Sequence, residues 1–97
     1  MRFEIVLAPE AVEDLYSLKR HLRAAVRDAL DKYLRHEPAR TSRSRIKRLR
    51  GLSKPQYRLR VGDVRVFYDV SGSTVEVLAV VPKAEAASWL TQFGSLE

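Results

Sequence analysis

The feature that most constrains the fold is a run of three strand-like segments joined by two tight turns, YRLRVGDVRVFYDVSGSTVEVLAVVP, residues 57–82. Gly62-Asp63 is a recognised two-residue hairpin loop, so residues 57–61 and 64–70 are predicted to pair as a β-hairpin. After the Ser-Gly-Ser turn, TVEVLAVVP is apolar on both faces apart from one glutamate. That pattern is typical of a central strand covered on both sides. The chain must therefore build an antiparallel sheet around this segment.

Side chains of the hairpin alternate between the two faces of the sheet. One face, which we expect to turn toward helices, carries Tyr57, Leu59, Val61, Val64, Val66 and Tyr68. The other face carries Arg58, Arg60, Arg65, Phe67 and Asp69. The two-residue loop places Arg60 directly opposite Arg65, and a like-charge pair of this kind costs roughly 0.2–1 kcal/mol. We expect the cations to form a patch on the face that the helices leave uncovered, where an anionic ligand would offset their repulsion.

The first third of the chain predicts a strand followed by two helices. Residues 2–7 alternate in hydrophobicity, and Pro9, with acids in the turn that follows, marks a helix start. Apolar residues then recur at helical spacing as far as Leu34. One helix of this length is unusual in so small a domain, so we expect a break between Lys19 and Arg23.

The remaining segments are shorter. Residues 38–45, PARTSRSR, are predicted to form a polar loop, residues 46–49 a short strand and residues 51–55 a turn. Residues 84–93 predict a short closing helix with apolar Trp89 on its inner side, and the last residues, GSLE, are expected to be mobile. The fold class is therefore α+β: an N-terminal strand, a two-helix hairpin, an antiparallel sheet of about four strands and a short C-terminal helix. The length of 97 residues suits one domain with a single core.

Positive charge is concentrated in one part of the chain. Between Arg40 and Arg65 there are ten Lys or Arg residues and a single acid, Asp63, which makes this segment +9, while the rest, with eight bases and eleven acids, is −3. Such asymmetry indicates a polyanionic partner that meets one face of the protein. Arginine predominates, and its guanidinium fork suits phosphate better than a lysine point charge does. The alternative is a solvated basic loop that merely aids solubility.

Several other classes of protein are disfavoured. The chain has no cysteine, which removes disulfides and thiolate metal sites and suits a reducing cytoplasm. The N-terminus carries acids and no long apolar run, so neither a signal peptide nor a membrane span is expected. His21 and His36 are far apart in sequence and are interpreted as surface residues. No metal-ligand spacing is present, and no cofactor is expected.

Three stretches, RLRGL (48–52), YRLRVGDVRVFYDV (57–70) and VLAVVPKAEAASWL (77–90), resemble the RelE/ParE superfamily of bacterial type II toxins, closest to the RelE-like branch. The resemblance implies a RelE-like fold and, for that branch, a metal-independent endoribonuclease that cuts mRNA in the ribosomal A site. In this chemistry the 2′-hydroxyl attacks the adjacent phosphate while basic side chains move protons and stabilise the phosphorane. It also implies a co-encoded acidic antitoxin, RelB-like, that holds the toxin inactive.

Matched motif to motif, the resemblance implies roles for individual residues. The expected catalytic residues are Arg58, Arg60, Arg65 and Lys83, and the expected RNA-binding residues are Arg50, Lys54, Arg48, Lys47 and Trp89. Arg58 and Arg60 replace lysines of the family, and a guanidinium, with a pKa above about 12, is a poor base. Like charges around a lysine favour its neutral form, so Lys83 is the expected proton donor to the leaving 5′-oxygen and Lys54 the second candidate.

Trp89 stands where the family has a tyrosine, so it lacks a phenolic hydroxyl for acid–base chemistry. It keeps an aromatic surface on which a base can stack, worth roughly 1–3 kcal/mol in single-strand binders. Core packing is the favoured interpretation, because Trp89 shares its helical face with Phe93.

Two alternatives remain from the sequence. One is a ParE-like toxin that shares the fold and binds DNA gyrase without cleaving RNA, which the missing lysines and tyrosine make credible. The other is a toxin that has lost catalysis and persists as a ribosome-binding or antitoxin-binding module. Alanine substitution of Arg65 and Lys83 would leave the cellular phenotype of such a module unchanged.

Overall fold

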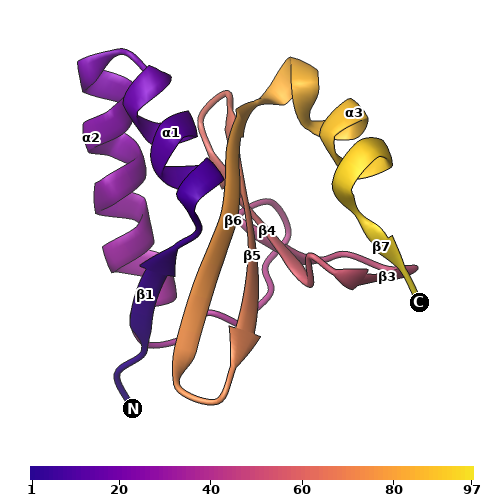
Figure 1. Ribbon diagram of the computed structural model, residues 1–97. Coiled ribbons are helices and arrows are strands. Elements are labelled where there is room, and N and C mark those ends of the chain that lie inside the picture. The colour runs from indigo at the N-terminus through magenta and orange to yellow at the C-terminus, as the bar shows by residue number, and fades with distance from the viewer.

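The computed structural model describes residues 1–97 and consists of a twisted sheet with two helices on one face and a third helix on the other (Figure 1). The elements in chain order are β1 (Glu4–Leu7), α1 (Pro9–Ser17), α2 (Arg20–Ala29), the π-helical turn η1 (Leu30–Leu34), β2 (Ile46–Arg48), β3 (Leu52–Lys54), β4 (Tyr57–Val61), β5 (Val64–Ser71), β6 (Thr74–Pro82), α3 (Lys83–Phe93) and β7 (Ser95–Leu96). The predicted α+β class is confirmed. No helix in the structure has the length and apolar character needed to span a membrane.

The helical hairpin follows the sequence pattern closely. Pro9 is the first residue of α1, and this helix ends at Ser17. Two residues separate it from α2, which begins at Arg20. The break therefore lies at Leu18 and Lys19, which confirms the predicted division into two helices. The end of α2 widens into the π-helical turn η1, which the apolar spacing did not indicate.

The main sheet has five strands in the order β1-β6-β5-β4-β2. Strands β2, β4, β5 and β6 are antiparallel neighbours, as predicted, and β1 adds a fifth strand parallel to β6. The hairpin register is the predicted one, with Val61 paired to Val64 and Arg60 paired to Arg65. Gly62 begins the turn with a φ of +58°, a left-handed conformation that glycine adopts without a steric penalty.

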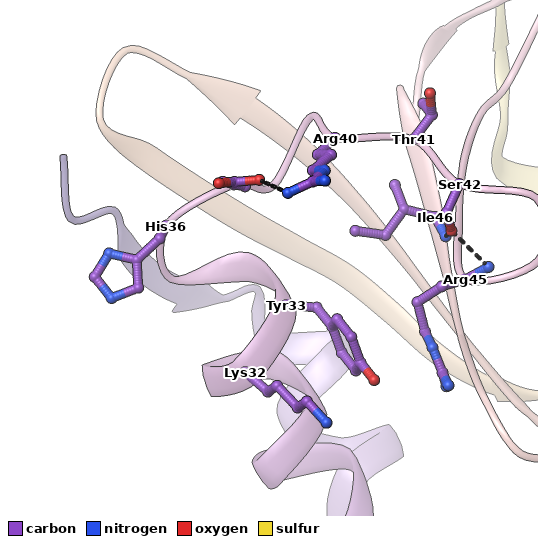
Figure 2. Close-up of a pocket in the computed structure, with 9 residues that line it drawn as sticks. Lys32, Tyr33, His36, Arg40, Thr41, Ser42, Arg45 and Ile46 are labelled. Carbon is purple, nitrogen blue, oxygen red and sulfur yellow. Dashed lines mark hydrogen bonds and ion pairs between the residues drawn. The ribbon is translucent and has the colours of Figure 1, made fainter.

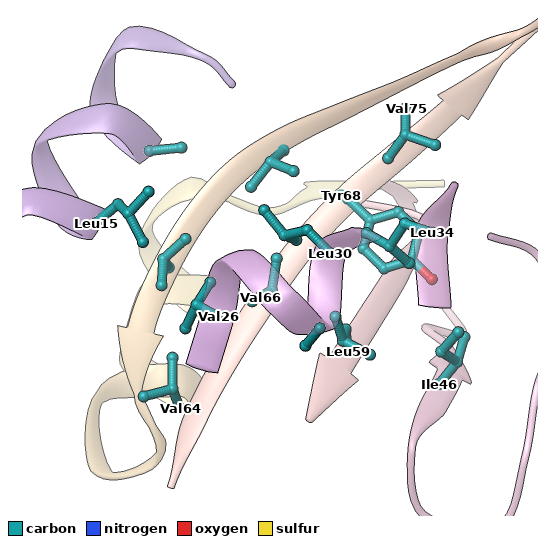
Figure 3. Packing of buried hydrophobic residues seen from close by; sticks show 14 residues of the cluster. Leu15, Val26, Leu30, Leu34, Ile46, Leu59, Val64, Val66, Tyr68 and Val75 are labelled. Atoms are coloured by element: carbon teal, nitrogen blue, oxygen red, sulfur yellow. The ribbon is translucent and has the colours of Figure 1, made fainter. Parts of the chain in front are cut away.

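The core lies between the α1–α2 layer and the sheet (Figure 3). Leu15 of α1, together with Val26 and Leu30 of α2 and η1, meets the inner face of β4, β5 and β6. Tyr68 is fully buried in this core, and its hydroxyl donates a hydrogen bond of 2.6 Å to the carbonyl of Pro38. This contact fixes the start of the loop between the helices and β2.

We expected the arginine-bearing face of the sheet to be left uncovered by helices, and this is wrong for the centre of that face. Phe67, Ala79 and Val81 are buried there beneath α3. The physical reason is that β5 and β6 carry apolar side chains on this face too, and apolar surface of this kind is stabilised by burial. The C-terminal helix supplies the cover, so the cations are confined to the ends and edges of the face.

The C-terminus also differs from expectation. Residues 51–55 were expected to form only a turn and residues 94–97 to be mobile, yet β3 and β7 pair as a separate two-stranded ribbon. Leu52 lies opposite Leu96, and the N–H of Glu97 donates to the carbonyl of Gly51 at 3.3 Å. Neither segment has a strand-like alternation, and their pairing joins the middle of the chain to its C-terminus, which only the tertiary fold brings together.

Replacing Tyr68 with phenylalanine is expected to lower the free energy of unfolding by about 1–3 kcal/mol, because the buried carbonyl of Pro38 loses its donor. Tyr57→Phe is the matched control, since Tyr57 stacks on Tyr68 at 5.4 Å and its hydroxyl makes no hydrogen bond within the chain. Urea denaturation of both variants measures the difference. Equal stability of the two variants would show that the Tyr68–Pro38 bond contributes nothing net.

Alkaline pH is expected to destabilise the wild-type chain through the same residue. Burial, and then the neighbouring Tyr57, raises the pKa of Tyr68 above its ordinary value of 10.0. The folded chain therefore keeps this proton at pH values where the unfolded chain releases it, so the stabilisation is complete below pH about 10 and is lost as the pH rises further. Denaturation between pH 8 and 11 should show a smaller decline for Tyr68→Phe than for the wild type.

Candidate active site

Three arginines of the β4–β5 hairpin, Arg58, Arg60 and Arg65, lie together on the sheet face opposite the α1–α2 layer, and we call them the arginine cluster. Arg60 and Arg65 are direct partners across the two strands. Partial burial, followed by the charges of Arg65 and Arg60, lowers the pKa of the Arg58 guanidinium. The like charges are therefore close enough to act on one another, as the hairpin register predicts.

Backbone carbonyls, and no carboxylates, hold the arginine cluster in place. Arg65 is only 8% exposed, and its Nη1 donates to the carbonyls of Gly62 at 2.8 Å and Val64 at 3.1 Å. Arg58 donates from Nη2 to the carbonyl of Ser44 at 3.2 Å. None of the ion pairs of the chain includes a member of the cluster. No carboxylate of the chain therefore offsets the charge of the cluster.

Two donors in the arginine cluster have no partner. The Nε atoms of Arg58 and Arg60 are buried and make no hydrogen bond. An unsatisfied buried donor costs about 1–3 kcal/mol, and more when the group is charged. A bound anion that reached these atoms would recover part of that cost.

Two lysines flank the arginine cluster. Lys83 is the first residue of α3, and its backbone N–H donates to the carbonyl of Asp63 at 2.7 Å, which places it beside the hairpin turn. Lys47 of β2 pairs with Arg58 and so shares its face of the sheet. Both lysines are exposed. The fold thus brings Lys83, far along the chain, next to the turn that separates Arg60 from Arg65.

The structure does not bring Lys54 or Arg48 to the arginine cluster. The Nζ of Lys54 lies 3.9 Å from carboxylate oxygens of both Asp69 and Glu76. Arg48 pairs in register with Tyr57, on the helix side of the sheet, and its guanidinium lies 5.3 Å from the centre of the Tyr57 ring.

Arg50 is exposed in the turn between β2 and β3 and makes no hydrogen bond or ion pair. It stays available to a ligand, without any contact that positions it.

Trp89 is mainly a packing residue, as favoured from its spacing. Its ring stacks on Phe67 with 4.9 Å between centroids and 5° between planes, and it also contacts Phe93 at 5.5 Å. One face of the indole is therefore already covered. Trp89 and Phe93 border a groove of about 480 Å³ against the start of α1, where Glu10 and Glu13 contribute negative charge.

The polar loop before β2 contributes contacts that the sequence analysis missed. Arg45 donates from Nη1 to the carbonyl of Arg60 at 3.1 Å, and its guanidinium lies over the ring of Tyr33 at 4.8 Å. The arginines and serines of this loop predicted a positive charge. Nothing in the sequence indicated which of the arginines would contact β4 and the helices.

The arrangement suits electrostatic stabilisation of an anion. Guanidiniums remain charged at any physiological pH and present several donors in a fixed fork. No group of three or more His, Asp or Glu side chains converges anywhere in the chain, and His21 and His36 are both exposed on the helical side. Beside the arginine cluster, Lys83 and Lys47 are the side chains that can exchange a proton.

The chain is similar to known proteins along most of its length. The model of the family described as ParE toxin of type II toxin-antitoxin system, parDE, matches residues 5–87. The toxin-antitoxin complex RelBE2 from Mycobacterium tuberculosis contains a chain that is 26% identical, with a TM-score of 0.70, covering 84% of this chain and 99% of that one. The archaeal RelE-RelB complex from Pyrococcus horikoshii OT3 contains a chain that is also 26% identical, with a TM-score of 0.64 and coverage of 86% and 97%.

A mutant of the Escherichia coli toxin RelE in the free state shares the fold, at 23% identity and a TM-score of 0.70, with coverage of 94% of this chain and 93% of that one. No curated protein sequence matches the chain.

Replacing Arg60 with glutamine is expected to raise the free energy of unfolding by about 0.2–1 kcal/mol, because one of two opposed charges disappears while the apolar stem remains. The gain should shrink in 1 M salt, where the Debye length falls to about 3 Å. Arg2→Gln removes an exposed charge whose side chain makes no hydrogen bond or ion pair, and it is the control. A loss of stability in Arg60→Gln would contradict the proposed repulsion.

Proposed function

The chain belongs to the RelE/ParE superfamily of type II toxin-antitoxin toxins, and from that premise we propose that its 97 residues form one toxin domain that cleaves mRNA as a metal-independent endoribonuclease. The proposed substrate is mRNA presented in the ribosomal A site. The proposed compartment is the cytoplasm, where ribosomes translate.

The observation that supports this proposal is the arginine cluster without a carboxylate partner. When a 2′-hydroxyl oxygen attacks the adjacent phosphorus, negative charge builds on the non-bridging oxygens of the phosphorane. Fixed guanidiniums aimed at those oxygens stabilise the transition state more than the ground state. Removing one donor from a preorganised site of this kind typically lowers kcat by about 10²–10³.

The proton balance assigns separate roles to the cluster and to Lys83. The 2′-hydroxyl gives its proton to water as its oxygen bonds to phosphorus, the bond from phosphorus to the 5′-oxygen breaks, and the leaving 5′-oxygen takes a proton from an ammonium group that water then reprotonates. We assign the proton to Lys83, which stands at the hairpin turn beside the arginine cluster. Arg58, Arg60 and Arg65 cannot exchange protons at neutral pH, so their part is to bind and stabilise charge.

An antitoxin is the proposed regulator. The RelBE2 and archaeal RelE-RelB structures are toxin-antitoxin complexes, which supports a partner of the same kind for this chain. We propose an acidic, RelB-like antitoxin whose carboxylates neutralise the arginine cluster. Such complementarity speeds association and fixes the orientation of the two proteins.

A second candidate is inhibition of DNA gyrase by binding, as a ParE-like toxin. The match to the ParE family model supports it. Two features of the site also support gyrase binding over RNA cleavage. Arg65 is buried and donates a hydrogen bond within its own hairpin, and none of the three arginines can act as a neutral base.

Induced wild-type protein is expected to arrest growth and to produce transcripts cut within codons, detected by primer extension. Arg60→Gln should reduce cleavage by about 10²–10³ although it folds at least as stably as the wild type, and Lys83→Ala should slow release of the 5′-oxygen. Arg2→Gln should cleave normally. Intact transcripts under wild-type induction would overturn the ribonuclease proposal.

The purified wild-type protein is expected to leave the supercoiling activity of DNA gyrase unchanged. If it inhibits supercoiling at amounts comparable to the enzyme while transcripts stay intact, the chain is a ParE-like toxin. A catalytically inactive Arg60→Gln variant tests whether any effect on gyrase depends on the arginine cluster.

A further inference from the structure

A cationic pocket lies across the β2 edge of the sheet from the arginine cluster, on the side of the helices. It has a volume of about 450 Å³ and is enclosed by the end of the helical layer and the loop that leads into β2 (Figure 2). Lys32 and Tyr33 of η1 form one wall, and Arg40, Ser42 and Arg45 of the loop form the other. We call it the η1 pocket. None of these residues has a role in the chemistry proposed above.

Contacts within the chain restrain the cations of the η1 pocket before any ligand binds. The guanidinium of Arg45 lies 4.8 Å from the centre of the Tyr33 ring, and the Nζ of Lys32 lies 5.3 Å from the same centre. Arg45 is further restrained by its bond to the carbonyl of Arg60 at 3.1 Å. A ligand therefore meets charges whose freedom is already reduced, which lowers the entropic cost of binding.

Ser42 supplies a hydroxyl donor to the same pocket. Its Oγ accepts the N–H groups of Arg45 at 3.0 Å and Ile46 at 3.2 Å, so both lone pairs are occupied. A serine hydroxyl has one proton and two lone pairs, so its remaining capacity is to donate. The proton of Ser42 is thus available to an acceptor in the pocket.

The charge balance of the η1 pocket favours an anion. Glu37 is its one carboxylate, and Arg40 holds it at 2.9 Å. Lys32 and Arg45 make no ion pair. With Lys32, Arg40 and Arg45 positive and Glu37 negative, the pocket carries a net charge of +2.

We propose that the η1 pocket binds a phosphate group of the RNA strand, away from the bond that is cut. An ammonium, a guanidinium fork and a hydroxyl donor together match the several acceptor oxygens of a phosphodiester. That the phosphate belongs to RNA rests on the function proposed above; the preference of the pocket for phosphate does not.

The η1 pocket and the arginine cluster are joined by one loop, which favours an RNA strand over an isolated anion as the ligand. The carbonyl of Arg45 accepts the N–H of Arg60 at 2.9 Å, and the carbonyl of Ser44 accepts the guanidinium of Arg58 at 3.2 Å. The loop segment 42–45 thus separates the two cationic sites and contacts both. A strand that crosses the β2 edge places one phosphate at the arginine cluster and another in the η1 pocket.

The test measures binding of a single-stranded RNA whose riboses are 2′-O-methylated, so that it cannot be cleaved. Lys32→Ala is expected to weaken its affinity by about 3- to 10-fold and to reduce the dependence of log K on log salt by about 0.7, the value for one lost phosphate contact on a single strand. Arg2→Ala, which removes an equal charge elsewhere, should change the affinity less than 2-fold. Arg45→Gln is the second variant.

Nuclear magnetic resonance of the Ser42 amide and the Tyr33 ring locates the ligand. RNA and inorganic phosphate are both expected to shift these signals in the wild type, and Lys32→Ala should need about 3- to 10-fold more of either ligand to reach the same shift. If wild-type protein cleaves no RNA yet the signals still shift with both probes, the pocket assignment stands and the enzymatic proposal fails. If neither probe shifts the signals, or if only an acidic peptide does, the phosphate assignment is overturned.

Discussion

The register of the β4–β5 hairpin is the constraint on which the rest of the structure depends. A two-residue turn that begins with left-handed Gly62 sets this register, and a slip by one residue would turn the side chains of one strand to the opposite face of the sheet. In the observed register, Val66 and Tyr68 enter the core beneath the helices. The same register gathers the three arginines on the opposite face, so folding and charge clustering have one cause.

The opposite face is divided between packing and charge. Phe67, Ala79 and Val81 occupy its centre and are covered by α3, while the arginines lie toward the hairpin turn and the β2 edge. Backbone carbonyls restrain Arg58 and Arg65 without neutralising them. The repulsion costs little against the burial of a core of this size, roughly 0.2–1 kcal/mol for an opposed pair. Family membership and this arrangement together make the cluster the centre of the proposed chemistry.

Much of the fold was predictable because it is local. The hairpin and the apolar side of the closing helix follow from turn residues and from periods of two or 3.6 residues. The grouping of the hairpin arginines followed from the same alternation. The division of the helical segment was expected from its length alone, and the break lies at Leu18 and Lys19, at the very start of the predicted range of Lys19 to Arg23. Three features were missed: the parallel pairing of β1 with β6, the β3–β7 ribbon and the packing of α3 against Phe67. Each of them joins segments that lie far apart in the sequence.

The sequence alone determined that Arg58, Arg60 and Arg65 share one face, because side-chain direction along a strand alternates with every residue. Only the tertiary structure decided which other basic residues join them. Lys83 reaches the hairpin turn because β6 runs back along β5, whereas Lys54 is drawn to Asp69 and Glu76. The position of these lysines depends on how elements far apart in the sequence pack together. The order of charges along the chain does not give the distances between them in the folded protein.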